Sequence, residues 1–205
     1  MNLFFDRLGV MKKLLGIIIL GLFLITPSQA GDIRDFQIEG MSIGDSLLDY
    51  FSAEIIEEKK KEKINFPKSK KFYRIVFKSN EVTYDFIGVY LKKNDSNYII
   101  YSLEGLKYMD YLPCKNKKKT VKNELNNIFE DKYKIKTYEE PHTFDKSKKS
   151  IVDITEFVGE NNYLVARIIC TDWSKKMGKK HSFYDLLSIY LNSKEFSDFI
   201  IYEAY

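Results

Sequence analysis

Ser46 is the strongest candidate nucleophile in this sequence, and Cys170 is the other candidate if it forms no disulfide. Ser46 lies in the string Gly44-Asp45-Ser46-Leu47. A serine hydroxyl needs a base to take its proton, commonly a histidine that a carboxylate orients. The chain has two histidines, His142 and His181, and both are distant from Ser46 in the sequence. A serine mechanism would therefore require the fold to bring a histidine to Ser46.

The same string resembles the nucleophile block of the GDSL esterase and lipase family, and this resemblance implies a small secreted hydrolase that uses Ser46. In that family a late Asp-x-x-His motif supplies the base. Here Glu139 stands three residues before His142, and Gly178 stands three before His181. The apolar spacing around Ser46 also predicts a helix, whereas the family places its serine just after a buried strand. The hydrolase is therefore the alternative hypothesis, and no catalytic residue is assigned.

The only tryptophan lies in the string Cys170-Thr171-Asp172-Trp173-Ser174. Asp172 and Trp173 come at the end of an expected strand, where such a pair can line a pocket. In the simpler interpretation Trp173 covers the edge of the core and Asp172 caps a turn. Both residues are pocket candidates.

Residues 11–30 have the three zones of a cleavable signal peptide. Two lysines follow Met11, residues 14–25 form an apolar run (LLGIIILGLFLI), and Pro27 then interrupts any helix. Small residues at Ser28 and Ala30 occupy the positions that signal peptidase recognises, so we expect cleavage between Ala30 and Gly31. The apolar run is shorter than the roughly 20 residues of a membrane span. An uncleaved signal would tether the protein to the inner membrane.

Residues 1–10 fit poorly in front of this signal, and we expect them to be a gene-start artefact with translation beginning at Met11. Cleavage would leave residues 31–205 as one domain, which is long enough for a hydrophobic core. It would also lower the count of Lys and Arg from 33 to 30 and that of Asp and Glu from 29 to 28, so the formal charge falls from +4 to about +2. This charge is too small to argue for nucleic acid or an anionic membrane as a partner. The lysine runs are expected to be solvated faces: they are 59–63, 117–119, 146–149 and 175–180.

Cys114 and Cys170 are the only cysteines. An even number in an exported protein permits a disulfide, which would stabilise the fold by roughly 3 to 4 kcal/mol on the loop-entropy estimate. Two separate buried thiols are the alternative. Two cysteines and two distant histidines lack the spacing of a metal site, so we expect no metal and no cofactor.

Apolar periodicity predicts an α+β domain with an antiparallel sheet and segregated helices. A helix capped by Ser42 is expected to continue to Lys61, followed by three strands and a second helix after Cys114 with Val121, Leu125, Ile128 and Phe129 on one face. Residues 132–150 are expected to form a loop, or a strand and a loop. The remaining elements are a hairpin, a last strand and a closing helix that carries Phe196, Phe199 and Ile200. The expected strands are 72–78, 84–92, 98–103, 151–158, 163–172 and 183–191. The order αβββ-αβββ-α suggests an internal duplication of residues 40–112 and 113–205.

The string Gly40-Met41-Ser42 before the expected helix resembles the Gly-Met-Ser/Thr start of the helix in SmpA/OmlA-type outer-membrane assembly proteins. That resemblance implies a helix-plus-antiparallel-sheet fold related to the β-lactamase-inhibitor protein, and a function in binding partners. The chain departs from the family because it lacks the lipid-attachment cysteine and the Gly-x-Pro turn after the helix. Over most of residues 31–205 the chain resembles uncharacterised exported proteins of streamlined, AT-rich marine bacteria, which implies export and a shared fold. The strings that carry this resemblance are IEGMSIGDSLLDYF, SKKFYRI, KKNDSNYIIYSLEG and CTDWS.

The export signal and the lack of a coherent catalytic set favour one function. We expect a periplasmic or secreted, non-catalytic binding or envelope adaptor module, whose partner is an envelope protein or a small ligand. We expect no nucleic-acid partner, and contact with the membrane only through an uncleaved signal.

Overall fold

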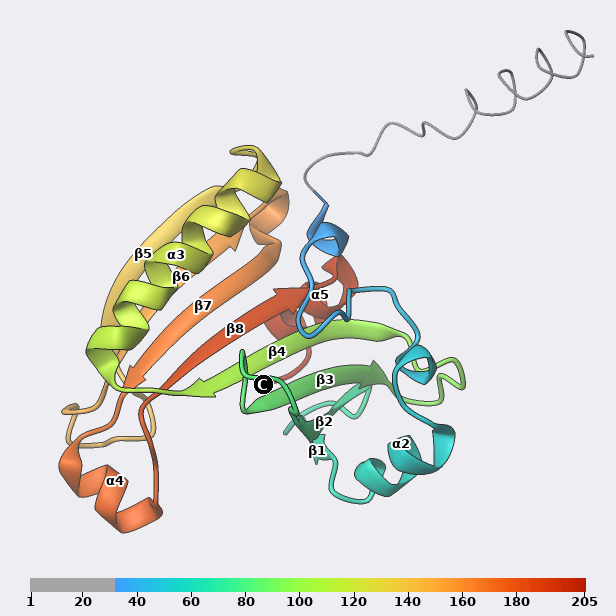
Figure 1. Ribbon diagram of the computed structural model, residues 1–205, viewed down its shortest axis with the longest axis horizontal. Helices are drawn as coiled ribbons and strands as arrows, with labels where there is room; N and C mark the ends of the chain where they lie inside the picture. The colour runs from blue at the N-terminus through green and yellow to red at the C-terminus, as the bar shows by residue number, and fades with distance from the viewer. Residues whose placement is uncertain (1–31) are drawn as a thin grey trace, which may run out of the picture. The chain divides into compact units, whose positions relative to one another are not determined.

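The computed structural model describes residues 32–205, which are coloured in Figure 1. The expected signal peptide, the start at Met11 and the cleavage point between Ala30 and Gly31 lie outside the described residues. Within residues 32–205, no helix has both the length and the apolar character that crossing a membrane would require.

Eight strands form one antiparallel sheet in the order β1-β2-β3-β4-β8-β7-β6-β5 (Figure 1). The strands are β1 Ile64–Asn65, β2 Phe72–Lys78, β3 Phe86–Lys92, β4 Ile100–Tyr108, β5 Lys134–Pro141, β6 Ile151–Val158, β7 Leu164–Asp172 and β8 Leu186–Asn192. β4 and β8 pair at the centre, so the first four strands form one half of the sheet and the last four form the other. The predicted α+β class with an antiparallel sheet is confirmed.

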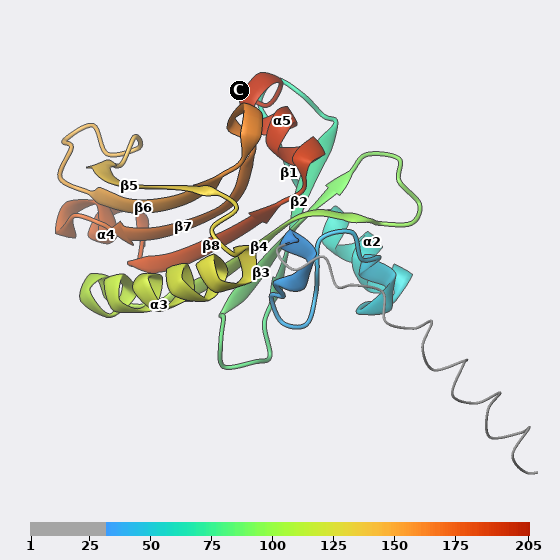
Figure 2. The same cartoon turned by 90° about the horizontal axis from the view of Figure 1, so that it is seen from above.

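Helices lie on both faces of this sheet (Figure 2). α2 (Ala53–Lys60) packs on β2, and α3 (Tyr111–Phe129) packs on the same face over β6, β7 and β8. α5 (Lys194–Tyr202) packs on the opposite face, against β4 and β7. α4 (Lys175–His181) lies in the connection between β7 and β8. The 3-10 turns are η1 Ile33–Asp35, η2 Leu47–Asp49 and η3 Glu160–Asn162.

Strand alternation divides the core between the two faces. Ile75 and Phe77 of β2 join the large core under α2 and α3. Phe72 of the same strand points the other way and packs on Phe199 of α5, with ring centroids 4.9 Å apart. The expected apolar faces of the second and last helices are confirmed. Val121, Leu125 and Phe129 of α3 are buried, and so are Phe196 and Phe199 of α5.

Cys114 of α3 and Cys170 of β7 form a disulfide. Both residues are fully buried where the helix crosses the strand. The bridge joins residues 56 positions apart and fastens α3 to the sheet. The predicted bridge is confirmed.

The helix expected to run on from Ser42 to Lys61 is wrong over its first part. Only Ala53–Lys60 is α-helical, and Gly44 has a left-handed φ of +94°. The backbone N–H of Gly44 donates to the carbonyl of Ile100 at 2.9 Å, so this segment pairs with the start of β4. This pairing uses backbone groups that a helix would need. The apolar spacing of Ile43, Leu47, Leu48, Phe51 and Ile55 predicts one buried helical face, but Leu48 and Ile55 are exposed and Ile56 is buried instead.

Other differences concern the number of elements. Each half of the sheet has four strands instead of the expected three. The additional strands are β1, which the sequence does not predict, and β5, which lies within the segment 132–150 expected to be a loop or a strand and a loop. β5 is an exposed edge strand with a polar sequence, so it lacks the apolar alternation that identifies a strand. α4 occupies the connection between the expected strands 163–172 and 183–191, for which no helix was expected, and β8 begins after it at Leu186.

Candidate functional site: a lysine-lined pocket

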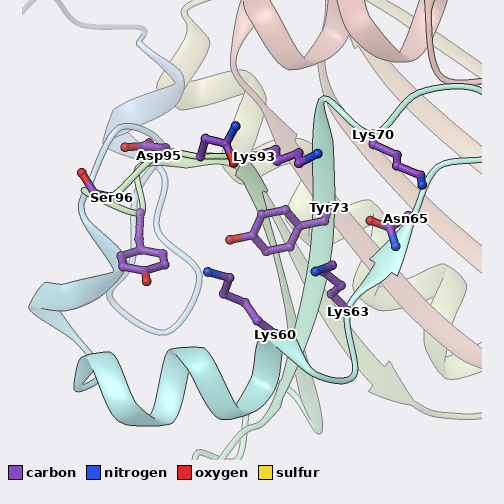
Figure 3. Close-up of a pocket in the computed structure, with 10 residues that line it drawn as sticks. Lys60, Lys63, Asn65, Lys70, Tyr73, Lys93, Asp95 and Ser96 are labelled. Atoms are coloured by element: carbon purple, nitrogen blue, oxygen red, sulfur yellow. The ribbon is translucent and has the colours of Figure 1, made fainter.

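A pocket of about 510 Å³ opens between the end of α2, the first two strands and the connection from β3 to β4 (Figure 3). Its volume is within the range of small-molecule sites. Four lysines line it, together with two tyrosines and four other polar residues. The lining residues are Lys60, Lys63, Asn65, Lys70, Tyr73, Lys93, Asn94, Asp95, Ser96 and Tyr98.

Tyr73 lies in the middle of the pocket, and Lys60 and Lys93 come to it from opposite sides (Figure 3). It belongs to β2 and is only 5% exposed. Burial raises the pKa of Tyr73 to about 12, so its hydroxyl stays protonated at neutral pH. The Nζ of Lys63 lies 5.8 Å from the centre of this ring. The pocket therefore has a fixed, neutral aromatic floor under its ammonium groups.

The lysines differ in how their charges are balanced. Lys60 forms an ion pair with Glu57 at 2.6 Å, and this hydrogen bond raises the pKa of Lys60. Across residues 32–205, Lys63, Lys70 and Lys93 form no ion pair. Three ammonium groups around the pocket therefore lack a carboxylate partner within the described chain.

The carboxylate of Asp95 belongs to the pocket but does not balance these lysines. It accepts backbone N–H groups of its own loop, from Asn97 at 2.9 Å and from Ile99 at 3.1 Å. Asn94 adopts a left-handed φ of 64°, which suits asparagine and helps the loop turn. Lys93 N donates to the Lys71 carbonyl at 2.8 Å, which ties this loop to the start of β2.

Ser46 lies behind this loop. Its hydroxyl donates to the carbonyl of Asn97 at 2.7 Å and accepts from the backbone N–H of Leu48 at 3.2 Å. Leu47 N donates to the carbonyl of Tyr98 at 3.0 Å. No histidine is among the hydrogen-bond partners of Ser46 in the described part of the chain. The candidate nucleophile therefore has no base beside it and serves to hold the pocket loop.

The two histidines lie elsewhere, in a cluster with the only tryptophan. Trp173 packs on His142 at 4.1 Å and on Phe183 at 4.5 Å between ring centroids, and Phe183 stacks on His181. The backbone N–H of Trp173 donates to Asp185 at 2.7 Å. The pocket candidates Asp172 and Trp173 thus do not join the lysine-lined pocket.

Asp172 is the other pocket candidate from the sequence. Burial raises its pKa, and the carboxylate of Asp185 adds to that shift.

Within residues 32–205, side chains of His, Cys, Asp and Glu do not gather in groups of three suited to a metal ion.

A second group of charges lies on the sheet face opposite α2, and these charges are balanced. Arg74 donates to Glu104 at 2.7 Å across Gly88, where a Cβ would come within 2.6 Å of the carboxylate. Tyr90 also donates to Glu104, and burial raises its pKa well above the usual range. Because these groups satisfy one another, they fit a structural role better than that of a ligand site.

Comparison with protein-family models, curated proteins and solved structures gives no match to this chain. The lysine-lined pocket itself was missed by sequence reasoning, which took the run 59–63 for a solvated face. Its lysines come from three separate segments, so no local spacing identifies them. The one available signal was the presence of a second lysine-containing segment, the turn at residues 92–97, which lines the pocket together with this run.

Proposed function

We propose that this protein is an exported, non-catalytic binding module whose lysine-lined pocket holds a small anion with two or more phosphate or carboxylate groups. The observation that carries the proposal is the set of three unpaired lysines, Lys63, Lys70 and Lys93, around the buried Tyr73. An ammonium and an anionic oxygen about 4 Å apart attract by roughly 4 kcal/mol near a protein surface before desolvation is subtracted. Several such contacts support a multivalent ligand over a singly charged one.

The geometry supports binding more than chemistry. Ser46 is engaged with the loop carbonyl of Asn97, and the tyrosine hydroxyl of the pocket is held protonated by burial. Neither group is prepared to act as a nucleophile or a base at neutral pH. The hydrolase alternative would need a base that the described residues do not place at Ser46.

Isothermal titration calorimetry on protein purified from the periplasm of an expression host tests the proposal. We expect pyrophosphate and citrate to bind, affinity to fall as salt rises, and a neutral sugar to give no heat. Lys63→Gln with Lys93→Gln should abolish measurable binding, whereas Lys60→Gln should have a smaller effect because that lysine is already paired with Glu57. The matched control, Lys78→Gln with Lys119→Gln, removes the same charge from exposed sites outside the pocket. Equal loss in the control, or no binding of either anion, would contradict the proposal.

Export is part of the same proposal and rests on the sequence of residues 11–30. N-terminal sequencing of protein recovered from the periplasm should begin at Gly31. Recovery only with the inner membrane, with residues 11–30 retained, would favour the tethered form. An intact peptide from residues 1–10 would contradict a start at Met11.

We also infer that the sheet arose by duplication of a helix followed by a four-stranded meander. Support comes from the strand order, in which β1 to β4 and β5 to β8 each run from one edge of the sheet inward to the central β4–β8 pair. α2 and α3, which precede the two meanders, lie on the same face. Superposing residues 53–108 on 111–192 tests this: the four strands should overlay in order and direction, and a mismatch would end the inference.

A further inference from the structure

Two lysine runs that are far apart in the sequence meet at one end of the sheet. One is in the β5–β6 connection, residues 142–150, and the other is on α4 (Figure 1). Ser174 joins them, since its N–H donates to the Ser150 hydroxyl at 3.0 Å and its hydroxyl donates to Asp145 at 3.1 Å. A cavity of about 490 Å³ lies between them, lined by lysines of both runs. We call this surface the basic end; its lysines are Lys146, Lys148, Lys149, Lys175, Lys176, Lys179 and Lys180.

All seven lysines are exposed, and within residues 32–205 none of them forms an ion pair. The carboxylate closest to them in the sequence is that of Asp145, which is buried. It accepts the hydroxyl and N–H groups of Ser147 and Ser150 at 2.7 to 3.0 Å. Asp145 therefore organises the loop from inside and leaves the charge of the lysines uncompensated.

An aromatic side chain, that of Phe144, lines the same cavity as Lys146, Lys176 and Lys180. Phe144 is 56% exposed, yet its ring packs on His181 at 5.5 Å and on Phe183 at 5.7 Å. Phe183 packs in turn on Trp173. Tyr184 is also exposed, but its ring packs on Tyr108 of β4 at 5.6 Å and does not line this cavity. The basic end thus presents one apolar ring on a packed support rather than on a free loop.

We propose that the basic end docks the protein on the surface of a bilayer that contains anionic phospholipids. The lysines contact lipid phosphates, and Phe144 lies at the level of the headgroups. This inference goes beyond the proposed anion pocket, because it rests on different residues at α4 and the β5–β6 connection.

Charge complementarity selects the partner. Each lysine close to an anionic membrane contributes about a fivefold gain in affinity. Lysines alone would suit any polyanion, but the exposed ring of Phe144 among them matches the interface between water and lipid. The lysines of both runs are exposed, as the sequence predicts for solvated faces. The sequence does not show that the two short runs form one surface, because only the fold brings them together.

Sedimentation of the exported form with vesicles tests the inference. We expect binding to phosphatidylcholine vesicles that contain 30% phosphatidylglycerol, loss of most binding in 500 mM salt, and little binding to pure phosphatidylcholine. Lys176→Gln with Lys180→Gln should weaken binding about 25-fold, at about fivefold per lysine. Phe144→Ala should weaken it several-fold at unchanged charge. The control Lys78→Gln with Lys119→Gln should bind as the unaltered protein does.

Three results would overturn the inference. One is equal binding to the two kinds of vesicle, and another is an equal loss in the control variant. The third combines two observations. A DNA oligonucleotide binds tightly and loses this binding in Lys176→Gln with Lys180→Gln, and Phe144→Ala leaves vesicle binding unchanged. Together they would identify a general polyanion surface. Circular dichroism of each variant verifies that it is folded, and Phe144→Gln replaces Phe144→Ala as the aromatic test if that variant is not.

Discussion

Lys118 of α3 donates a hydrogen bond to Asp153 of β6, and both side chains are buried between the helix and the sheet. Replacing the lysine by methionine would leave the buried carboxylate without its partner. We expect Lys118→Met to lower the free energy of unfolding by about 3 to 5 kcal/mol. Urea unfolding measures this change.

The matched variant for that pair removes both charges. Lys118→Met with Asp153→Leu should recover most of the lost stability, since a well-packed apolar pair of similar volume is often neutral. The Nζ of Lys115 lies 4.0 Å from Asp153 and is available to compensate in part. A single variant as stable as the unaltered protein would mean that Lys115 or water replaces Lys118 at no cost.

The disulfide between Cys114 and Cys170 closes a loop of 56 residues between α3 and β7. We expect Cys114→Ala with Cys170→Ala to lower the free energy of unfolding by about 4 kcal/mol, mainly by releasing the unfolded chain. Denaturant unfolding with and without reductant checks this, because the reductant should destabilise the unaltered protein and leave the variant unchanged. Equal sensitivity of both proteins to reductant would contradict the role assigned to the bridge.

Asp145 makes the stability of the basic end depend on pH. Hydrogen bonds from Ser147 and Ser150 hold the pKa of Asp145 well below its usual range. A carboxylate whose pKa is lower in the folded state than in the unfolded chain, where it is about 4, stabilises the fold above that pH. This stabilisation is lost as pH falls through the folded pKa.

The melting temperature of the unaltered protein and of Asp145→Asn, recorded from pH 7 to pH 2.5, tests that prediction. The variant should melt lower at pH 7, and the gap should narrow below about pH 4. A constant gap over this range would show that Asp145 does not titrate as expected.

The elements that sequence reasoning placed correctly are those with a local pattern. Val121, Leu125 and Phe129 repeat at helical spacing, and the hairpin with Gly159 in its turn joins two runs rich in β-branched and apolar residues. The segment around Ser46 failed because its apolar spacing imitated a helix, while its backbone groups pair with β4 across a long sequence separation. The lysine-lined pocket and the basic end are each formed by residues from segments far apart in the sequence. No local sequence pattern therefore predicts them.

Ser46 lies in the string that suggests catalysis, but in the structure its hydroxyl supports the pocket loop through Asn97. Ser46→Ala would leave the carbonyl of Asn97 without its 2.7 Å donor and loosen the loop that carries Lys93 and Tyr98. We expect a loss of about 1 kcal/mol in stability and, through the loop, about fivefold weaker binding of pyrophosphate. Ser46→Thr retains the hydroxyl and should restore both. Calorimetry and thermal melting measure the two effects, and an ester substrate assayed in parallel separates the hypotheses. Ester hydrolysis that disappears in Ser46→Ala while pyrophosphate affinity stays constant would replace the binding role by the hydrolase.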